Sequence, residues 1–178
     1  MLFRSVPARD DLRRVRRRIR LLAACIDGPQ DVWLAARMLG WRIVLPALKY
    51  RLPLPRLAEL MWRDAETPAR RADQERRITM LARGLYGPRE LLPLDNCLER
   101  SLVLYRFLSE AGAAPRLLVG VGGAESVLGH AWVMLDGEPV HETRASLEEW
   151  VPVLAFSAGG TAQRLEPQGG DTLVEDPV

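Results

Sequence analysis

Apolar residues in the first half of the chain recur at the three- and four-residue spacing of amphipathic helices. Between residues 10 and 27 the positions with this spacing are Leu12, Val15, Ile19, Leu22 and Ile26. We expect further helices over residues 31–50, 56–63 and 67–86. The stretch 31–50 is the most apolar, and it predicts a helix that is buried on most sides and kinked near Pro46. Thr67-Pro68 has the pattern of an N-cap followed by the first helical residue.

The second half changes from a helical pattern to the alternation that is typical of β-strands. Residues 97–111 carry an apolar stripe at helical spacing, and Gly112 follows where a helix would end. Strands are expected over residues 116–121, from His130 onward, and over residues 151–156. The first two are joined by a Gly-rich loop between Gly120 and Gly129, and Asp136-Gly137 is a hairpin turn. Ser146–Trp150 predicts one helical turn.

Charge divides the chain into a basic and an acidic half. Residues 1–90 carry 20 Arg and Lys against 10 Asp and Glu, and residues 91–178 carry 5 against 13. This division has two interpretations: the two halves attract each other, or the basic half faces an acidic peptide, a partner or a membrane surface. Arg37, Gly40, Arg42 and Pro46 interrupt the apolar stretch, so we expect no membrane span.

Several function classes lack their sequence signals. The chain has no nucleic-acid-binding motif, and it has no Gly-rich phosphate loop with a lysine. Cys25 and Cys97 make neither a disulfide framework nor a metal-binding pattern, so we expect no cofactor and no metal. We see no secretory signal and expect a cytoplasmic protein, where thiols stay reduced.

Cys97 is the candidate nucleophile because it stands at the start of a predicted helix. Asn96 is the expected N-cap, and Glu99 is placed to complete a capping box. The free N–H groups and the positive end of the helix dipole favour the thiolate form of a cysteine at this position. The Cys97 backbone N–H is also one expected oxyanion-hole donor, and the second donor is not identified.

His130 is the candidate general base, because it begins a predicted strand 33 residues after Cys97. This interval leaves room for a helix, a turn and one strand between the two residues. A cysteine on a helix that faces a histidine on a strand is the arrangement of papain-like and transglutaminase-like enzymes. We expect Trp132, on the same strand, to be a core residue. Two roles are open for Arg100 and Ser101, one turn into the helix: a structural one, or lining the cleft.

The carboxylate that would orient His130 depends on the length of the hairpin loop. Asp136 lies about 20 Å along the same strand at 3.3 Å per residue, which excludes it. A two-residue loop sends Glu142 to the opposite face from His130 and leaves His141 as the alternative contact. A three-residue loop, Asp136-Gly137-Glu138, with a bulge places Glu142 on the face of His130, so the triad requires the odd loop or a bulge.

The runs CLERSLVLYRFLSEAG, GVGG and GHAWVMLDGEPVHE resemble the transglutaminase-like leader peptidases of lasso-peptide biosynthesis. The resemblance covers about Leu94 to Thr143, with a weaker likeness over Leu48–Met61. It implies a cysteine peptidase with Cys97 as nucleophile and His130 as base. Family members carry aspartate twelve residues after the histidine, where this chain has Glu142.

The resemblance also implies a substrate and partners. The substrate would be a ribosomally made lasso-peptide precursor, from which the enzyme releases the leader. Members of this short kind resemble half of a split system, in which a separate small protein holds the leader and a cyclase consumes the freed core. One alternative is a non-catalytic scaffold of the same fold. The other is an acyltransferase that uses an amine acceptor instead of water.

Together these observations predict an α+β protein. We expect a helical N-terminal region over residues 1–90, packed on a transglutaminase-like and papain-like core over residues 91–156. That core would contain one cysteine-bearing helix and an antiparallel sheet. The remainder, residues 157–178, is Gly-rich and acidic and is expected to be poorly ordered.

Overall fold

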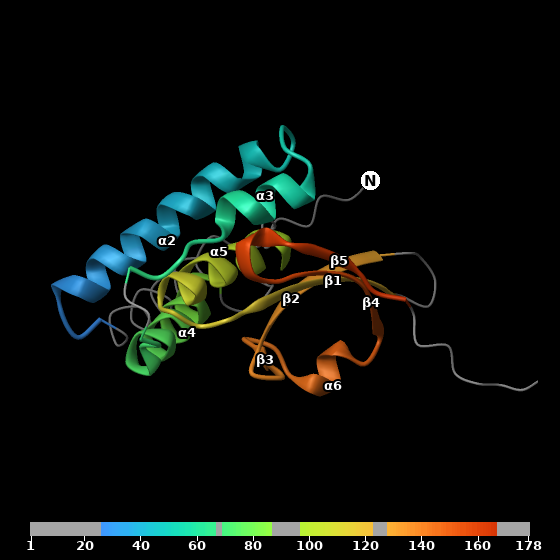
Figure 1. Cartoon of the computed structure of the whole chain (residues 1–178). Helices are drawn as coiled ribbons and strands as arrows, with labels where there is room; N and C mark the ends of the chain where they lie inside the picture. Colours follow the sequence, from blue (N-terminus) through green and yellow to red (C-terminus); the bar gives the residue numbers. More distant parts are fainter. Residues whose placement is uncertain (1–25, 67–68, 87–96, 123–127, 167–178) are drawn as a thin grey trace, which may run out of the picture.

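The computed structural model describes residues 26–66, 69–86, 97–122 and 128–166. Within these ranges, helices gather beside a single antiparallel sheet, so the predicted α+β class is confirmed (Figure 1). The expected helix over residues 10–27 lies almost entirely outside the described residues, as do Asn96 and Cys25.

Three helices of the first half pack against a fourth that carries Cys97. They are α2 (Pro29–Leu48), α3 (Leu54–Met61) and α4 (Ala72–Tyr86). The fourth, α5 (Cys97–Glu110), contacts each of them as well as strands β1 and β2 of the sheet. It therefore lies between the other helices and the sheet, as Figure 1 shows.

The structure corrects two expectations about these helices. Thr67-Pro68 does not begin α4, because residues 69–71 are not helical and the helix starts at Ala72. The Arg71 backbone N–H instead donates to the Ala111 carbonyl oxygen at 3.0 Å, which ties this segment to the end of α5. The second correction concerns α2, which is buried on one face only. Its outward residues include Val32, Trp33 and Ile43, which are 53%, 68% and 72% exposed.

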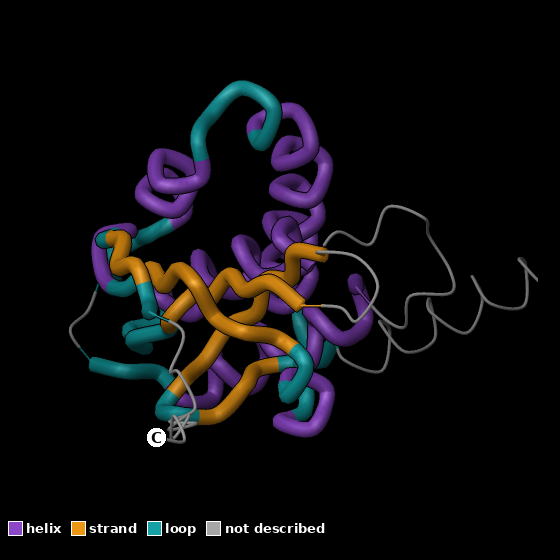
Figure 2. The backbone as a smooth tube through the Cα atoms, turned by 90° about the vertical axis from the view of Figure 1, so that its right-hand side faces the viewer, coloured by secondary structure: helices purple, strands orange, loops and turns teal. Residues whose placement is uncertain are grey.

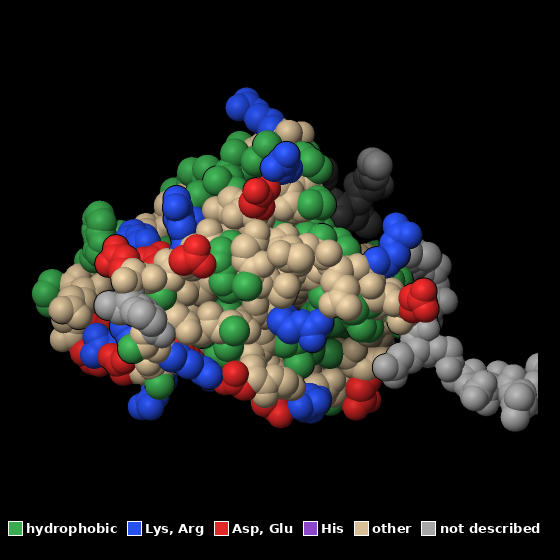
Figure 3. Space-filling model, in the orientation of Figure 1, with side chains coloured by type: hydrophobic (Ala, Val, Ile, Leu, Met, Phe, Trp, Pro, Cys, Tyr) green, Lys and Arg blue, Asp and Glu red, His purple; other side chains and the backbone are tan. Residues whose placement is uncertain are grey.

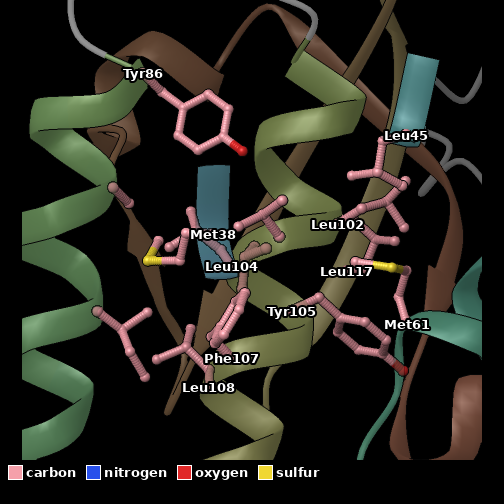
Figure 4. Packing of buried hydrophobic residues seen from close by; sticks show 14 of the residues in the cluster. Met38, Leu45, Met61, Tyr86, Leu102, Leu104, Tyr105, Phe107, Leu108 and Leu117 are labelled. Atoms are coloured by element: carbon pink, nitrogen blue, oxygen red, sulfur yellow. The ribbon is translucent and has the colours of Figure 1, made fainter. Parts of the chain in front are cut away.

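The core is built around α5, in which every residue from Ser101 to Ser109 is buried. Figure 4 shows its apolar side chains packing against residues of the surrounding elements. These partners include Met38 and Leu45 of α2, Met61 of α3, Tyr86 of α4 and Leu117 of β1. Gly112 follows the helix with φ +83°, so the predicted helix end is confirmed. This packing holds α5 between the other helices and the sheet, and with it the first turn of the helix, which carries Cys97.

Five strands form one sheet in the order β3-β2-β1-β4-β5, and every neighbouring pair is antiparallel. Their bounds are β1 Arg116–Gly122, β2 Leu128–Leu135, β3 Glu138–Val140, β4 Trp150–Phe156 and β5 Ala162–Arg164. Figure 2 shows them as a twisted sheet in the middle of the view. The predicted strands over residues 116–121, from His130 onward and over residues 151–156 are confirmed.

The chain after Glu142 differs from its prediction in two places. The helical turn is α6 (Arg144–Leu147), capped by the Thr143 side chain, and Trp150 belongs to β4 instead. The segment from Ser157, predicted to be poorly ordered, forms the 3-10 turn η1 (Ala158–Gly160) and then β5. The Tyr105 hydroxyl donates to the Ser157 carbonyl, which anchors this segment to α5. Residues 167–178 lie outside the described residues.

Within the described part of the chain, no helix is long and apolar enough to cross a membrane.

Candidate active site

The first turn of α5 lies against an open edge of β2. Strand β3 pairs only with the end of β2, from Val133 to Leu135, so among the described strands none covers Ala131 on that side. Ser101 Oγ donates to the Ala131 carbonyl at 2.9 Å, and the Ala131 backbone also hydrogen-bonds the Cys97 sulfur. Ser101, whose role the sequence left open, is therefore structural: it ties the cysteine turn to the strand that carries His130.

Cys97 and His130 form a hydrogen-bonded pair. Burial raises the pKa of the Cys97 thiol, but the His130 hydrogen bond, the Ala131 backbone bond and the charges of His130 and Arg100 together bring it below its ordinary value. The hydrogen bonds that His130 makes to Cys97 and then to Glu142 raise its pKa to about 9, against the opposing effect of burial. Both changes favour a thiolate beside an imidazolium, which is the reactive form of a cysteine nucleophile.

Glu142 completes a chain of three groups. Its Oε2 lies 2.9 Å from His130 Nε2. Burial raises the pKa of this carboxyl, but the His130 hydrogen bond and the positive charge of Arg100 outweigh burial and lower it. An ionised carboxylate accepts a hydrogen bond, so His130 Nε2 carries a proton. His130 Nδ1 is then the ring nitrogen left to exchange a proton with Cys97.

The hairpin that brings Glu142 to this place has a two-residue loop. Leu135 pairs with Glu138, and Asp136 and Gly137 have φ of 52° and 80°, as a type I′ turn requires. The three-residue loop is therefore wrong. Wrong too is the inference that an even loop turns Glu142 away from His130.

The irregularity lies at His141, beyond the end of β3. His141 has φ 74°, in the left-handed region that side chains other than glycine rarely adopt. This residue ends the strand alternation, so the direction of Glu142 does not follow from counting along β3. His141 is not the partner of His130. Its buried Nδ1 has no hydrogen-bond partner among the described residues, and burial lowers its pKa to about 4.

Two tryptophans stack on the imidazole of His130. The Trp150 ring centroid lies 4.7 Å from that of His130, and the Trp132 centroid lies 5.8 Å from it. Trp132 is buried, as expected for a core residue. The Trp150 contact was missed, because the sequence placed Trp150 in a helical turn. The available signal was Gly122, which pairs with Trp150 in the sheet and whose missing side chain leaves room for the Trp150 ring.

The remaining polar groups of the cysteine turn have partners of their own. Glu99 is buried and pairs with Lys49 at 2.9 Å. Its expected capping partner, Asn96, lies outside the described residues. Arg100 Nη2 donates to Glu142 Oε1. The Ser101 hydroxyl donates to the Ala131 carbonyl, so it does not supply the second oxyanion-hole donor.

No group of three or more His, Cys, Asp or Glu side chains within the described ranges could hold a metal ion. The site brings together a thiol, an imidazole and a carboxylate, those of Cys97, His130 and Glu142. Such a set is suited to acyl transfer through a thioester.

Comparison with known families gives the class of protein to which this fold and this site belong. The family model of the transglutaminase-like superfamily matches residues 35–155. The chain belongs to this superfamily, whose members are commonly cysteine peptidases or acyltransferases. Comparison with curated proteins and comparison with solved structures each gave no match.

Proposed function

We propose that this protein is a cysteine peptidase that removes the leader from a ribosomally made lasso-peptide precursor. The observation that carries the proposal is the hydrogen-bonded series Cys97–His130–Glu142 on a transglutaminase-like fold. The leader-peptide substrate is supported by the resemblance of the segments around Cys97 and His130 to leader peptidases. A reduced cysteine suits the cytoplasm, where we place the reaction.

The reaction follows from the roles of the three groups. The Cys97 thiolate attacks the carbonyl carbon of the scissile bond, and its oxygen takes the negative charge. His130 gives its Nδ1 proton to the leaving amine as the C–N bond breaks, which frees the core and leaves the leader as a thioester. His130 then takes a proton from water, and the hydroxide releases the leader as a carboxylate and returns Cys97 to the thiolate. Glu142 orients His130 and stabilises the imidazolium without reacting.

Replacing Cys97 or His130 tests this proposal directly. We expect Cys97→Ala and His130→Ala each to abolish leader removal, measured by mass spectrometry of a precursor peptide, while circular dichroism shows that both variants remain folded. The two residues act as a unit, so either loss costs nearly all the rate. Full activity of a folded variant would refute the assignment and favour the non-catalytic scaffold. The product mass separates the other alternative, because hydrolysis adds water whereas an acyltransferase adds its amine.

We also propose that a separate leader-holding protein docks on the outward face of α2, and that a lasso cyclase consumes the freed core. The outward face consists of Val32, Trp33, Leu39, Ile43 and Val44, which are all exposed. Figure 3 shows hydrophobic side chains at the surface where α2 runs in Figure 1.

The charged residues of α2 are turned inward, which leaves this face without charge. Asp31 pairs with Arg77, Arg37 pairs with Glu110, and the Arg42 guanidinium lies 5.0 Å from the Tyr86 ring centroid. An uncharged helix face suits a protein partner, since the cores of interfaces are depleted in charged residues. The net positive charge of the first 90 residues favours an acidic partner.

A further inference from the structure

Arg100 has a place in the site that the catalytic roles above do not use. Its Nη2 donates to Glu142 Oε1, while the other carboxylate oxygen, Oε2, faces His130 Nε2. The Arg100 and Glu142 side chains are only 13% and 12% exposed. Salt screens a partly buried pair much less than a surface pair. The carboxylate is therefore held from both sides, by a permanent cation and by the imidazole.

These contacts form a closed circuit that begins and ends on one helical turn. Cys97 and Arg100 are three residues apart in α5, so they lie on the same face of the helix. From Cys97 the hydrogen bonds lead to His130 on β2, then to Glu142, and back to Arg100. The backbone does not fix Glu142 by itself, because β3 ends at Val140 and His141 is left-handed.

We propose that Arg100 is a positioning residue that holds Glu142 so that Oε2 faces His130 Nε2, which directs His130 Nδ1 toward Cys97. The inference rests on the proposed function in assigning roles to these three residues. A guanidinium suits this task because it is always charged and presents its donors in a rigid plane. The Arg100–Glu142 ion pair thus connects the helix of the nucleophile to the segment of the orienting carboxylate.

Among the described residues, four other charged or titratable groups surround these contacts. They are Lys49 after α2, Arg83 on α4, Glu99 on α5, and His141 beside Glu142. The Lys49 charge is engaged by Glu99 at 2.9 Å. His141 is neutral near pH 7, because burial lowers its pKa to about 4. Arg100 is thus the one cation of the described residues that forms an ion pair with Glu142, apart from His130 itself.

The test reads the Cys97 thiol without any peptide substrate. In the full chain with Cys25→Ser, Cys97 is the single thiol, and its alkylation by iodoacetamide is followed by mass spectrometry from pH 5 to pH 10. We expect Arg100→Gln to shift the profile to higher pH and to slow alkylation at pH 7 about threefold to tenfold. The reason is that the thiolate loses the stabilisation that a correctly oriented His130 imidazolium gives it. Arg100→Lys keeps a cation and should recover part of the shift.

Arg37→Gln is the matched control, because it removes another arginine–glutamate ion pair of α5, at the opposite end of the helix. It should leave the profile unchanged. The Glu142→Gln background then tests whether Arg100 acts through the carboxylate. There, Arg100→Gln should slow alkylation by at most about a further twofold, since residues that act through one another are not additive.

Two results would overturn the proposal. One is a profile of Arg100→Gln that coincides with that of the parent. The other is an equal shift in the Glu142→Gln background, which would mean that Arg100 acts on the thiol by its charge alone. If Arg100→Gln does not fold by circular dichroism, the Lys variant decides by the same comparison. Precursor cleavage is assayed separately: a shifted thiol profile without any cleavage would refute the peptidase proposal and leave the positioning role standing.

Discussion

The amide substitution Glu142→Gln should place the proton on the wrong nitrogen of His130. Gln has the shape of Glu, but one of its two terminal atoms is a donor instead of an acceptor. Arg100 donates to the position of Oε1, so the amide oxygen must take that place. The amide nitrogen then faces His130 Nε2 and donates to it, although Nε2 donates to Glu142 in the parent protein.

An imidazole that accepts at Nε2 carries its proton on Nδ1, where it can no longer take a proton from Cys97. In the serine-protease triad, the corresponding amide substitution lowers kcat by about 10⁴ through the same change of tautomer. The variant also loses the carboxylate charge that raises the pKa of His130. We therefore expect Glu142→Gln to lower the cleavage rate by about 10²–10⁴, with a residual rate above that of Cys97→Ala.

Two comparison variants separate this explanation from simple loss of a contact. Glu142→Ala removes the carboxylate without imposing a donor, so it should be more active than Glu142→Gln. The double variant Arg100→Gln, Glu142→Gln frees the amide to turn its oxygen toward His130, and it should recover part of the rate. The assay is single-turnover cleavage of a precursor peptide followed by mass spectrometry.

The reasoning fails if Glu142→Gln cleaves at the parent rate, because Glu142 would then not orient His130. It fails equally if Glu142→Ala is the slower of the two single variants, because an imposed tautomer would then not be the cause.

Three further predictions concern pH, packing and partners. Cleavage should fall as the pH rises through about 9, where His130 loses the proton that it gives to the leaving amine, and it should fall at low pH as the Cys97 thiolate is protonated. A pH profile of kcat/KM that does not decline on the alkaline side would contradict this. Gly120→Ala should destabilise the fold by about 1–3 kcal/mol, measured by chemical denaturation, because its Cβ would lie 2.8 Å from the Trp132 ring; unchanged stability would contradict the packing argument. The leader-holding partner should stimulate cleavage less as salt rises, since exposed charges are screened over about 10 Å at 0.1 M. Ile43→Glu on α2 should weaken that stimulation, whereas Met80→Glu at an exposed position of α4 should not. Cleavage that needs no partner and does not respond to salt would leave residues 1–90 with a structural role.

Local patterns in the sequence were sufficient to predict the helix and the strands that carry the residues of the site. The helix from Cys97 to Glu110 could be predicted because its apolar stripe and Gly112 agree on its bounds. The strand of His130 could be predicted from its period of two. Asp136-Gly137 marked the hairpin for a local reason as well, since both positions of a type I′ turn need positive φ.

The contact between His130 and Glu142 could not be derived in the same way. It depends on the left-handed conformation of His141, and the intrinsic preference of histidine for this conformation is too weak to predict it from the sequence. Tertiary contacts determine the backbone conformation of such a residue, and here they are the contacts of Arg100 and His130 with the neighbouring Glu142. The exposure of α2 was missed for a related reason. Its arginines find carboxylate, carbonyl and aromatic partners on other helices, so the charged residues face inward and apolar ones face solvent.

The spacing of three residues in α5 explains why so much of the site lies in one short run of sequence. Cys97, Arg100 and Ser101 are at positions i, i+3 and i+4, which a helix places on one face. Ser101 holds the strand of His130 through the Ala131 carbonyl, and Arg100 holds Glu142. Cys97 therefore stands on the same turn as the two residues that hold the strand of His130 and the carboxylate of Glu142. A small rotation of this turn would move all three contacts together, so the geometry of the site depends on how firmly the rest of α5 is packed in the core.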